Sequence, residues 1–97
     1  MPVVVSSALE TSVGIRAGVA LAAALPELPY ACGLNTVALL TDDVADTPLV
    51  AVAGRLAVGE LVVDDEALAR CGAAPEVAGY WQSRWASTNS LAEARRG

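Results

Sequence analysis

The residues of this sequence best suited to hold an anion follow a short run of valines near its start. Valines at positions 3–5 precede Ser6 and Ser7, and Thr11 and Ser12 add two further hydroxyls. A continuous β-branched run predicts a strand covered on both faces, as in a parallel sheet. The helix expected after it brings free N–H groups and the positive end of its dipole. This pattern predicts an anion-binding loop, with plain turn and cap chemistry as the alternative.

A helix is expected after this loop, and a second strand-to-helix unit after that helix. Thr11 or Ser12 is a good N-cap for a helix through about residue 25, which Pro26 ends. A brief strand at 30–32 then leads into a loop, and Thr36 is placed to cap a short helix over 37–44. The loop consists of Gly33, Leu34 and Asn35. In α/β folds the loops after neighbouring parallel strands meet at one edge of the sheet, which is where ligands bind.

After residue 48 the expected order of elements changes from strand–helix units to an extended segment followed by two helices. Residues 49–63 are expected to form a hairpin or a meandering cover segment. Three acids at 64–66 open a helix through Arg70, and Pro75 begins another that carries an aromatic face predicted to pack in a core. This face consists of Tyr80, Trp81 and Trp85, and from Ser87 a frayed polar tail is expected. We therefore divide the chain into 1–47, 48–86 and 87–97.

The sequence lacks the residues most often used for general acid–base catalysis, and no metal-binding residue is assigned. The chain has neither histidine nor lysine, so the commonest general bases are absent. No aspartate or glutamate is assigned to a metal or to catalysis. The clustered acids are expected to be solvated or to cap helices, and they are Asp42, Asp43, Asp64, Asp65 and Glu66.

Composition narrows the possible partners. The net charge is −5 and all six basic residues are arginines without a basic stripe, which argues against nucleic acid. The longest apolar run covers residues 17–25, which is too short to cross a membrane. Cys32 and Cys71 are expected to be reduced cytosolic thiols, so we expect a cytoplasmic protein. With 55% hydrophobic and only 18% charged residues, so small a chain is expected to self-associate or to be part of something larger.

Three stretches of the sequence resemble o-succinylbenzoate synthases of the enolase superfamily. They are residues 4–15, 23–34 and 49–56, within a resemblance that spans residues 3 to about 62. The resemblance implies an α/β fold consisting of the last two βα units of a (β/α)₈ barrel, followed by a segment that returns to a capping domain. Because a complete barrel takes about 250 residues, we expect a C-terminal fragment of such an enzyme.

The resemblance also implies a function. The whole enzyme would dehydrate 2-succinyl-6-hydroxy-2,4-cyclohexadiene-1-carboxylate in menaquinone biosynthesis, with Mg²⁺ and lysines held on strands two to six. Those strands have no counterpart here, so the chain alone is expected to be inactive. Ser6 and Ser7 match the serines that contact the substrate's succinyl carboxylate, and Gly33, Leu34 and Asn35 match the loop lining the same pocket. The alternatives are a fragment of an N-succinylamino acid racemase or related epimerase, and a non-catalytic module that binds an anion or oligomerises.

Overall fold

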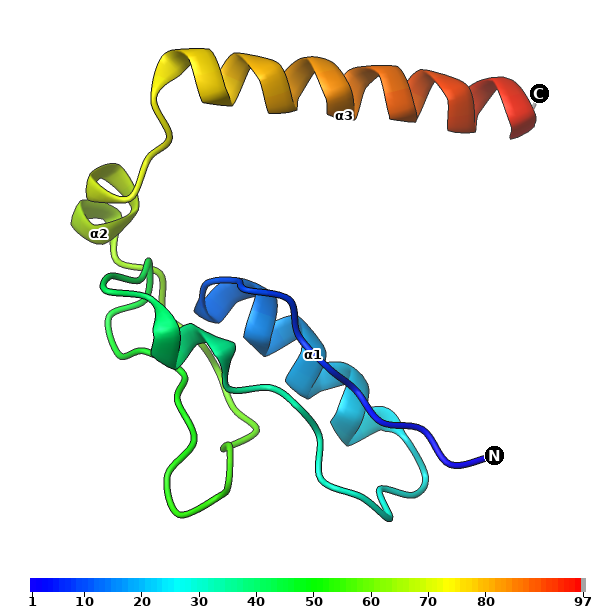
Figure 1. The fold of residues 1–97 in the computed structure, drawn as a ribbon, viewed down its shortest axis with the longest axis vertical. Coiled ribbons are helices and arrows are strands. Elements are labelled where there is room, and N and C mark those ends of the chain that lie inside the picture. The colour runs from blue at the N-terminus through cyan, green and yellow to red at the C-terminus, as the bar shows by residue number, and fades with distance from the viewer. Residues whose placement is uncertain (97) are drawn as a thin grey trace.

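The computed structural model describes residues 1–96 and contains four helical elements. These are α1 (Ser12–Ala24), the 3₁₀ helix η1 (Thr36–Leu39), α2 (Asp65–Arg70) and α3 (Pro75–Arg96). The N-terminal segment runs beside α1, whereas α3 stands apart from the rest of the chain (Figure 1). Among the helices of residues 1–96, none has both the length and the hydropathy needed to cross a bilayer.

The hydrophobic core lies between α1 and the segments on either side of it in sequence. One face of α1 contributes Ile15, Val19 and Ala22, and the cluster is completed by Val5, Leu34 and Val37. The all-round small surface of this helix predicts contact on more than one side, but the structure buries only one face. Val13 and Leu21 on the other faces are 49% and 55% exposed.

The two predicted strands do not form as strands. Within residues 1–96 the only trace of the sheet is a parallel bridge between Ser6 and Gly33, with Val3 and Val4 exposed beside it. A pair of parallel strands is marginal without further neighbours to complete the ladder and cover its faces. Of the expected pair of strand–helix units, residues 1–96 therefore show a helix, a 3₁₀ turn and one bridge between the segments that precede them, and a barrel sheet is not confirmed.

Residues 44–64 form a long loop that folds back on itself. An antiparallel bridge between Ala45 and Val63 closes its base, and a bridge between Val52 and Arg55 closes its tip. The two tip residues, Ala53 and Gly54, have φ of 51° and 74°, as in the type I′ turns that join two antiparallel strands. Of the two predicted forms, the meandering cover segment is the closer description, since Leu49 and Leu56 pack against the core.

The helix expected over residues 37–44 is only one turn long. η1 ends at Leu39, and Thr36 does not cap it with its side chain. The chain beyond it is held elsewhere, because Asp43 hydrogen-bonds to Ser12 at the start of α1. The helix predicted to open at 64–66 forms as expected: the Asp64 side chain accepts a hydrogen bond of 3.0 Å from the N–H of Ala67.

α3 differs from expectation in its length and its surroundings. The tail predicted to fray from Ser87 is helical as far as Arg96, and Gly97 lies outside the described residues. Its alanine, leucine, glutamate and arginine residues are strong helix formers, and the basic last turn complements the helix dipole. None of the side chains of α3 is buried, so the aromatic face predicted to pack in a core is instead exposed to solvent.

Candidate functional site

The bridge between Ser6 and Gly33 joins the two loops in which the sequence predicts a binding site. The N–H of Ser7 donates to the carbonyl of Gly33 at 2.8 Å, and the N–H of Gly33 donates to the carbonyl of Val5 at 2.9 Å. These bonds place Ser6, Ser7 and Gly33 side by side although they are far apart in sequence. Three of the five predicted site residues therefore meet at one point of the fold.

Ser6 is the predicted site residue whose side chain is most available. It is exposed, and the described residues include no hydrogen-bond partner for its hydroxyl. Its Oγ lies 3.4 Å from the position that a Cβ on residue 33 would take, so the absence of a side chain at Gly33 leaves room for it. In a parallel ladder alternate residues bond to opposite sides, and the N–H of Ser6 accordingly points away from Gly33. Ser6 can thus offer a hydroxyl and an N–H to a ligand.

Ser7 is more committed to the fold than Ser6. Its hydroxyl donates to the carbonyl of Gly33 at 3.0 Å and lies 2.7 Å from Oγ1 of Thr36. Thr36 also donates to the carbonyl of Ala8 at 2.6 Å. The sequence predicts only a capping role for Thr36. The signal that could have indicated this contact is a hydroxyl residue three positions after Gly33, in the second of the two loops. The two hydroxyls therefore fasten the loops to each other.

The side chains of Leu34 and Asn35 lie away from the serines. Leu34 is only 6% exposed and belongs to the core cluster under α1. The Oδ1 of Asn35 accepts a hydrogen bond of 2.7 Å from the N–H of Ala51 in the cover segment. Only the backbone of these two residues is left to shape the loop, because the side chain of Leu34 packs in the core and that of Asn35 holds the cover segment.

The start of α1, expected to offer free N–H groups to an anion, is already occupied. Thr11 is the N-cap residue but makes no side-chain cap bond. Instead Asp43, one of the acids expected to be solvated or to cap helices, is only 7% exposed and accepts the N–H of Ser12 at 3.0 Å. The hydroxyl of Ser12 donates to the other oxygen of the same carboxylate. The predicted anion site at the helix terminus is therefore filled from within the chain.

The remaining acids of the described residues are not gathered into a metal site. Asp42 forms an ion pair with Arg70 at 2.5 Å on the surface, and this hydrogen bond holds the pKa of Asp42 well below its usual range. Partial desolvation raises the pKa of the neighbouring Cys71 thiol, and the charge of Asp42 adds to the effect. Among residues 1–96 there is no group of three or more carboxylate or thiol side chains placed to hold a metal ion. The described residues thus do not fit Mg²⁺ on their own.

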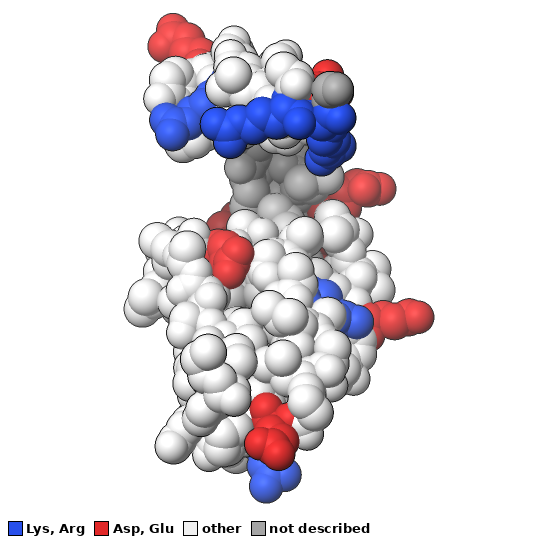
Figure 2. Space-filling model, turned by 90° about the vertical axis from the view of Figure 1, so that its right-hand side faces the viewer, with Lys and Arg blue, Asp and Glu red and all other residues white. Residues whose placement is uncertain are grey.

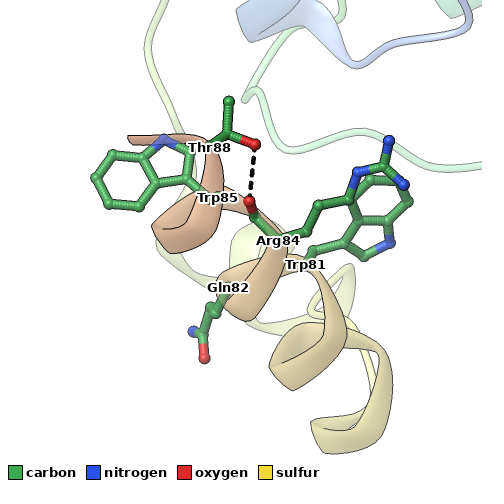
Figure 3. A pocket seen from close by; sticks show the side chains of 5 residues that line it. All are labelled: Trp81, Gln82, Arg84, Trp85 and Thr88. Atoms are coloured by element: carbon green, nitrogen blue, oxygen red, sulfur yellow. Dashed lines mark hydrogen bonds between the residues drawn. The ribbon is translucent and has the colours of Figure 1, made fainter. Parts of the chain in front are cut away.

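A second surface of interest lies on α3. A groove of about 570 Å³ is lined by Trp81, Gln82, Arg84, Trp85 and Thr88. Figure 3 shows the two indole rings projecting in different directions, with the guanidinium of Arg84 against Trp81, 5.7 Å from its ring centroid. Arginine side chains gather on α3, while most of this face of the remaining chain is uncharged (Figure 2). Exposed aromatic surface of this kind is typical of a contact with another polypeptide.

Comparison with known proteins identifies relatives over nearly the whole chain, although no protein-family model matches it. An o-succinylbenzoate synthase of Thermobifida fusca is 55% identical over 93 residues, which are 96% of this chain and 28% of the relative. The o-succinylbenzoate synthase of Mycobacterium marinum is 49% identical over 87% of this chain and 25% of its own length. That of Mycobacterium tuberculosis is 48% identical over 94% of this chain and 28% of its own length. The chain thus spans about a quarter of these relatives.

Proposed function

The chain is homologous to a C-terminal part of o-succinylbenzoate synthases, and from that premise we propose that it supplies one side of the substrate site of such an enzyme. The observation that carries the proposal is the Ser6–Gly33 bridge, because it brings together the loops that follow residues 3–5 and residues 30–32. The ligand is the succinyl carboxylate of 2-succinyl-6-hydroxy-2,4-cyclohexadiene-1-carboxylate.

Ser6 is the main binding residue in this proposal. Its exposed hydroxyl and its outward N–H both donate to a carboxylate oxygen, and hydrogen bonds to a charged acceptor are stronger than those between neutral groups. Ser7 has a smaller role, since its hydroxyl would have to break its hydrogen bond to the carbonyl of Gly33 or to the hydroxyl of Thr36 before it could donate to a ligand. Gly33 lies next to these serines, and Leu34 and Asn35 contribute to the proposed site through their backbone, since their side chains contact the core and the cover segment.

The chemistry itself needs groups that this chain lacks. Removal of a proton next to a carboxylate requires a base and a stabiliser of the enediolate, which the family provides with lysine and Mg²⁺. The chain has no lysine. We therefore propose that it is inactive alone, and that its partner is the remaining three quarters of a synthase, which would also cover the aromatic side chains of α3.

A chimera tests this function. The part of the Thermobifida fusca synthase that matches this chain is replaced by residues 1–97, and dehydration is assayed with Mg²⁺ beside the 97-residue chain alone. We expect turnover by the chimera and none by the chain. A folded chimera without dehydration contradicts the proposal, and preferential racemisation of an N-succinylamino acid favours the epimerase alternative. Ser6→Ala in the active chimera is expected to raise KM by about tenfold, the effect of a lost hydrogen bond to a charged group.

A further inference from the structure

We propose that Asp43 is a positioning residue: its carboxylate occupies the N-terminus of α1, fixes the downstream end of the Ser6–Ser12 loop and closes that helix end to anionic ligands. The proposal rests on the proposed function only in that the loop it holds is the substrate loop. It deepens that function by separating the two places where an anion could bind, the serine pair and the helix terminus.

The hydrogen bonds around Asp43 are complete. One carboxylate oxygen accepts the N–H of Ser12 at 3.0 Å and the N–H of Val44 at 2.9 Å, and the other accepts the Ser12 hydroxyl. Ser12 is fully buried, and its oxygen also accepts the N–H of Leu49 at 2.8 Å. A buried carboxylate is tolerated when charge-assisted hydrogen bonds and a helix dipole replace its water. Asp43 has both, so it acts as the cap that Thr11 does not provide.

The same contacts hold the substrate loop at its far end. The loop begins at the Ser6–Gly33 bridge, and the hydroxyl of Thr36 holds its middle by a hydrogen bond to the carbonyl of Ala8. It ends at Ser12, whose N–H donates to the carboxylate of Asp43. Asp43 lies in the segment that follows the Gly33–Asn35 loop. The carboxylate therefore ties the two loops of the proposed site to each other at a second point, beyond the bridge.

A negative charge at this place also decides where a ligand binds. The first N–H of α1 is used by Asp43, and the carboxylate of Glu10 lies against Gly14 in the first turn. A further anion at the helix terminus would lie close to both carboxylates, and neighbouring like charges repel. The hydroxyl of Ser6, by contrast, is exposed and has no hydrogen-bond partner among the described residues, so the carboxylate of a substrate is directed to the serines.

Amide hydrogen exchange and anion titration of the 97-residue chain test the proposal. Asp43→Ala is expected to speed exchange of the Ser12 amide by about tenfold, the loss expected for a helix cap with a charged acceptor. Sodium acetate is then expected to restore protection and to shift the amide resonances of Ser12–Gly14. Acetate can reach the vacated place, because Asp43 lines an open groove of about 760 Å³. In the unaltered chain acetate is expected to leave these amides unmoved.

Two further variants keep the test decisive. Asp43→Asn preserves the shape of the side chain without its charge, and is expected to speed Ser12 exchange even if Asp43→Ala fails to fold. Asp46→Asn makes the same change at an exposed position of the same segment and is expected to leave Ser12 unchanged.

The proposal is overturned if neither Asp43 variant changes the exchange of the Ser12 amide. It is also overturned if, in the unaltered chain, acetate binds at Ser12–Gly14 or the Ser12 amide is unprotected. Titration with succinate separates this from the proposed function. If succinate leaves Ser6–Ala8 unmoved while the Asp43 results hold, the carboxylate site at the serines is wrong and the capping role stands.

Discussion

At the scale of single residues, the hydroxyls of Ser7 and Thr36 have three oxygen contacts but only two hydrogens to donate. Removing the Thr36 hydroxyl takes away the donor to the carbonyl of Ala8, whereas the carbonyl of Gly33 also accepts from the N–H of Ser7. We expect Thr36→Val to lower the free energy of unfolding by about 1 kcal/mol, the net worth of one hydrogen bond. Urea unfolding followed by circular dichroism measures it. Thr41→Val, on the exposed surface nearby, is the matched control, and equal effects of the two substitutions would show that Thr36 fastens nothing.

Asp42 gives the chain a residue-scale dependence on pH. Its pKa is lowered in the folded chain by Arg70, so the ion pair favours folding above the ordinary carboxyl pKa of about 4 and this contribution is lost as the pH falls through the lowered pKa. The effect is small, because the two side chains are 43% and 57% exposed.

We therefore expect Asp42→Asn to lower the urea midpoint slightly and constantly from about pH 5 to 8, with the difference from the unaltered chain shrinking below about pH 4. Asp46→Asn, with no described ion pair, is expected to show no such trend. A difference between Asp42→Asn and the unaltered chain that grows toward low pH would have the wrong sign for this ion pair.

At the scale of elements, two glycines of α1 are expected to respond oppositely to alanine. A Cβ at residue 14 meets the flexible side chain of Glu10, which can move aside, so Gly14→Ala is expected to raise the free energy of unfolding by about 0.5–1 kcal/mol through helix propensity. A Cβ at residue 18 comes within 2.8 Å of Cδ2 of buried Leu34. Overpacking there costs about 1–3 kcal/mol, so Gly18→Ala is expected to give no gain or a loss. Thermal unfolding compares them, and equal stabilisation would mean that α1 does not pack on Leu34.

The elements that the sequence predicts best are those with local signals. α1 begins at a hydroxyl residue and ends before Pro26, and the first turn of α2 is capped by Asp64, the first of its three acids. Strands at residues 3–5 and 30–32 do not form, since a parallel ladder depends on neighbours that the described chain does not contain. For the tail after Ser87, polarity was the wrong guide, and the helix propensity of its last residues was the better one.

The candidate site divides in the same way. Ser6, Ser7 and Gly33 could be placed together because loops after neighbouring parallel strands share an edge. Capping was one of the roles expected for Asp43, but the helix that it caps could not be predicted, because its partner Ser12 is 31 residues away and nothing in the local sequence distinguishes it from Asp42. One of these neighbouring aspartates is buried against a helix and the other pairs with Arg70 on the surface. Only the tertiary path of the chain decides between them.

At the scale of the whole molecule, the chain is more extended than an independent domain of its length. Its radius of gyration is 16.1 Å, whereas a compact domain of about 100 residues has about 13 Å. The excess comes from α3, which stands apart and buries no side chain (Figure 1). We expect an exposed helix with two tryptophans to pack on a partner. The relatives of this chain have about three quarters of their length outside the matched part.

That partner should make the same substitution act differently in two settings. Trp81 is 58% exposed here, so Trp81→Ala is expected to change the free energy of unfolding of the 97-residue chain by less than about 0.5 kcal/mol. In the chimera with the rest of a synthase the indole becomes buried, and the loss is expected to reach about 3–5 kcal/mol.

Urea unfolding followed by far-ultraviolet circular dichroism measures both, and Gln82→Ala on the same turn is the control for helix propensity. Equal small effects of Trp81→Ala in chain and chimera would mean that the aromatic surface of α3 faces solvent in the whole enzyme too. A large effect in the isolated chain, dependent on its concentration, would instead show that a second copy covers α3, as expected of the self-associating alternative.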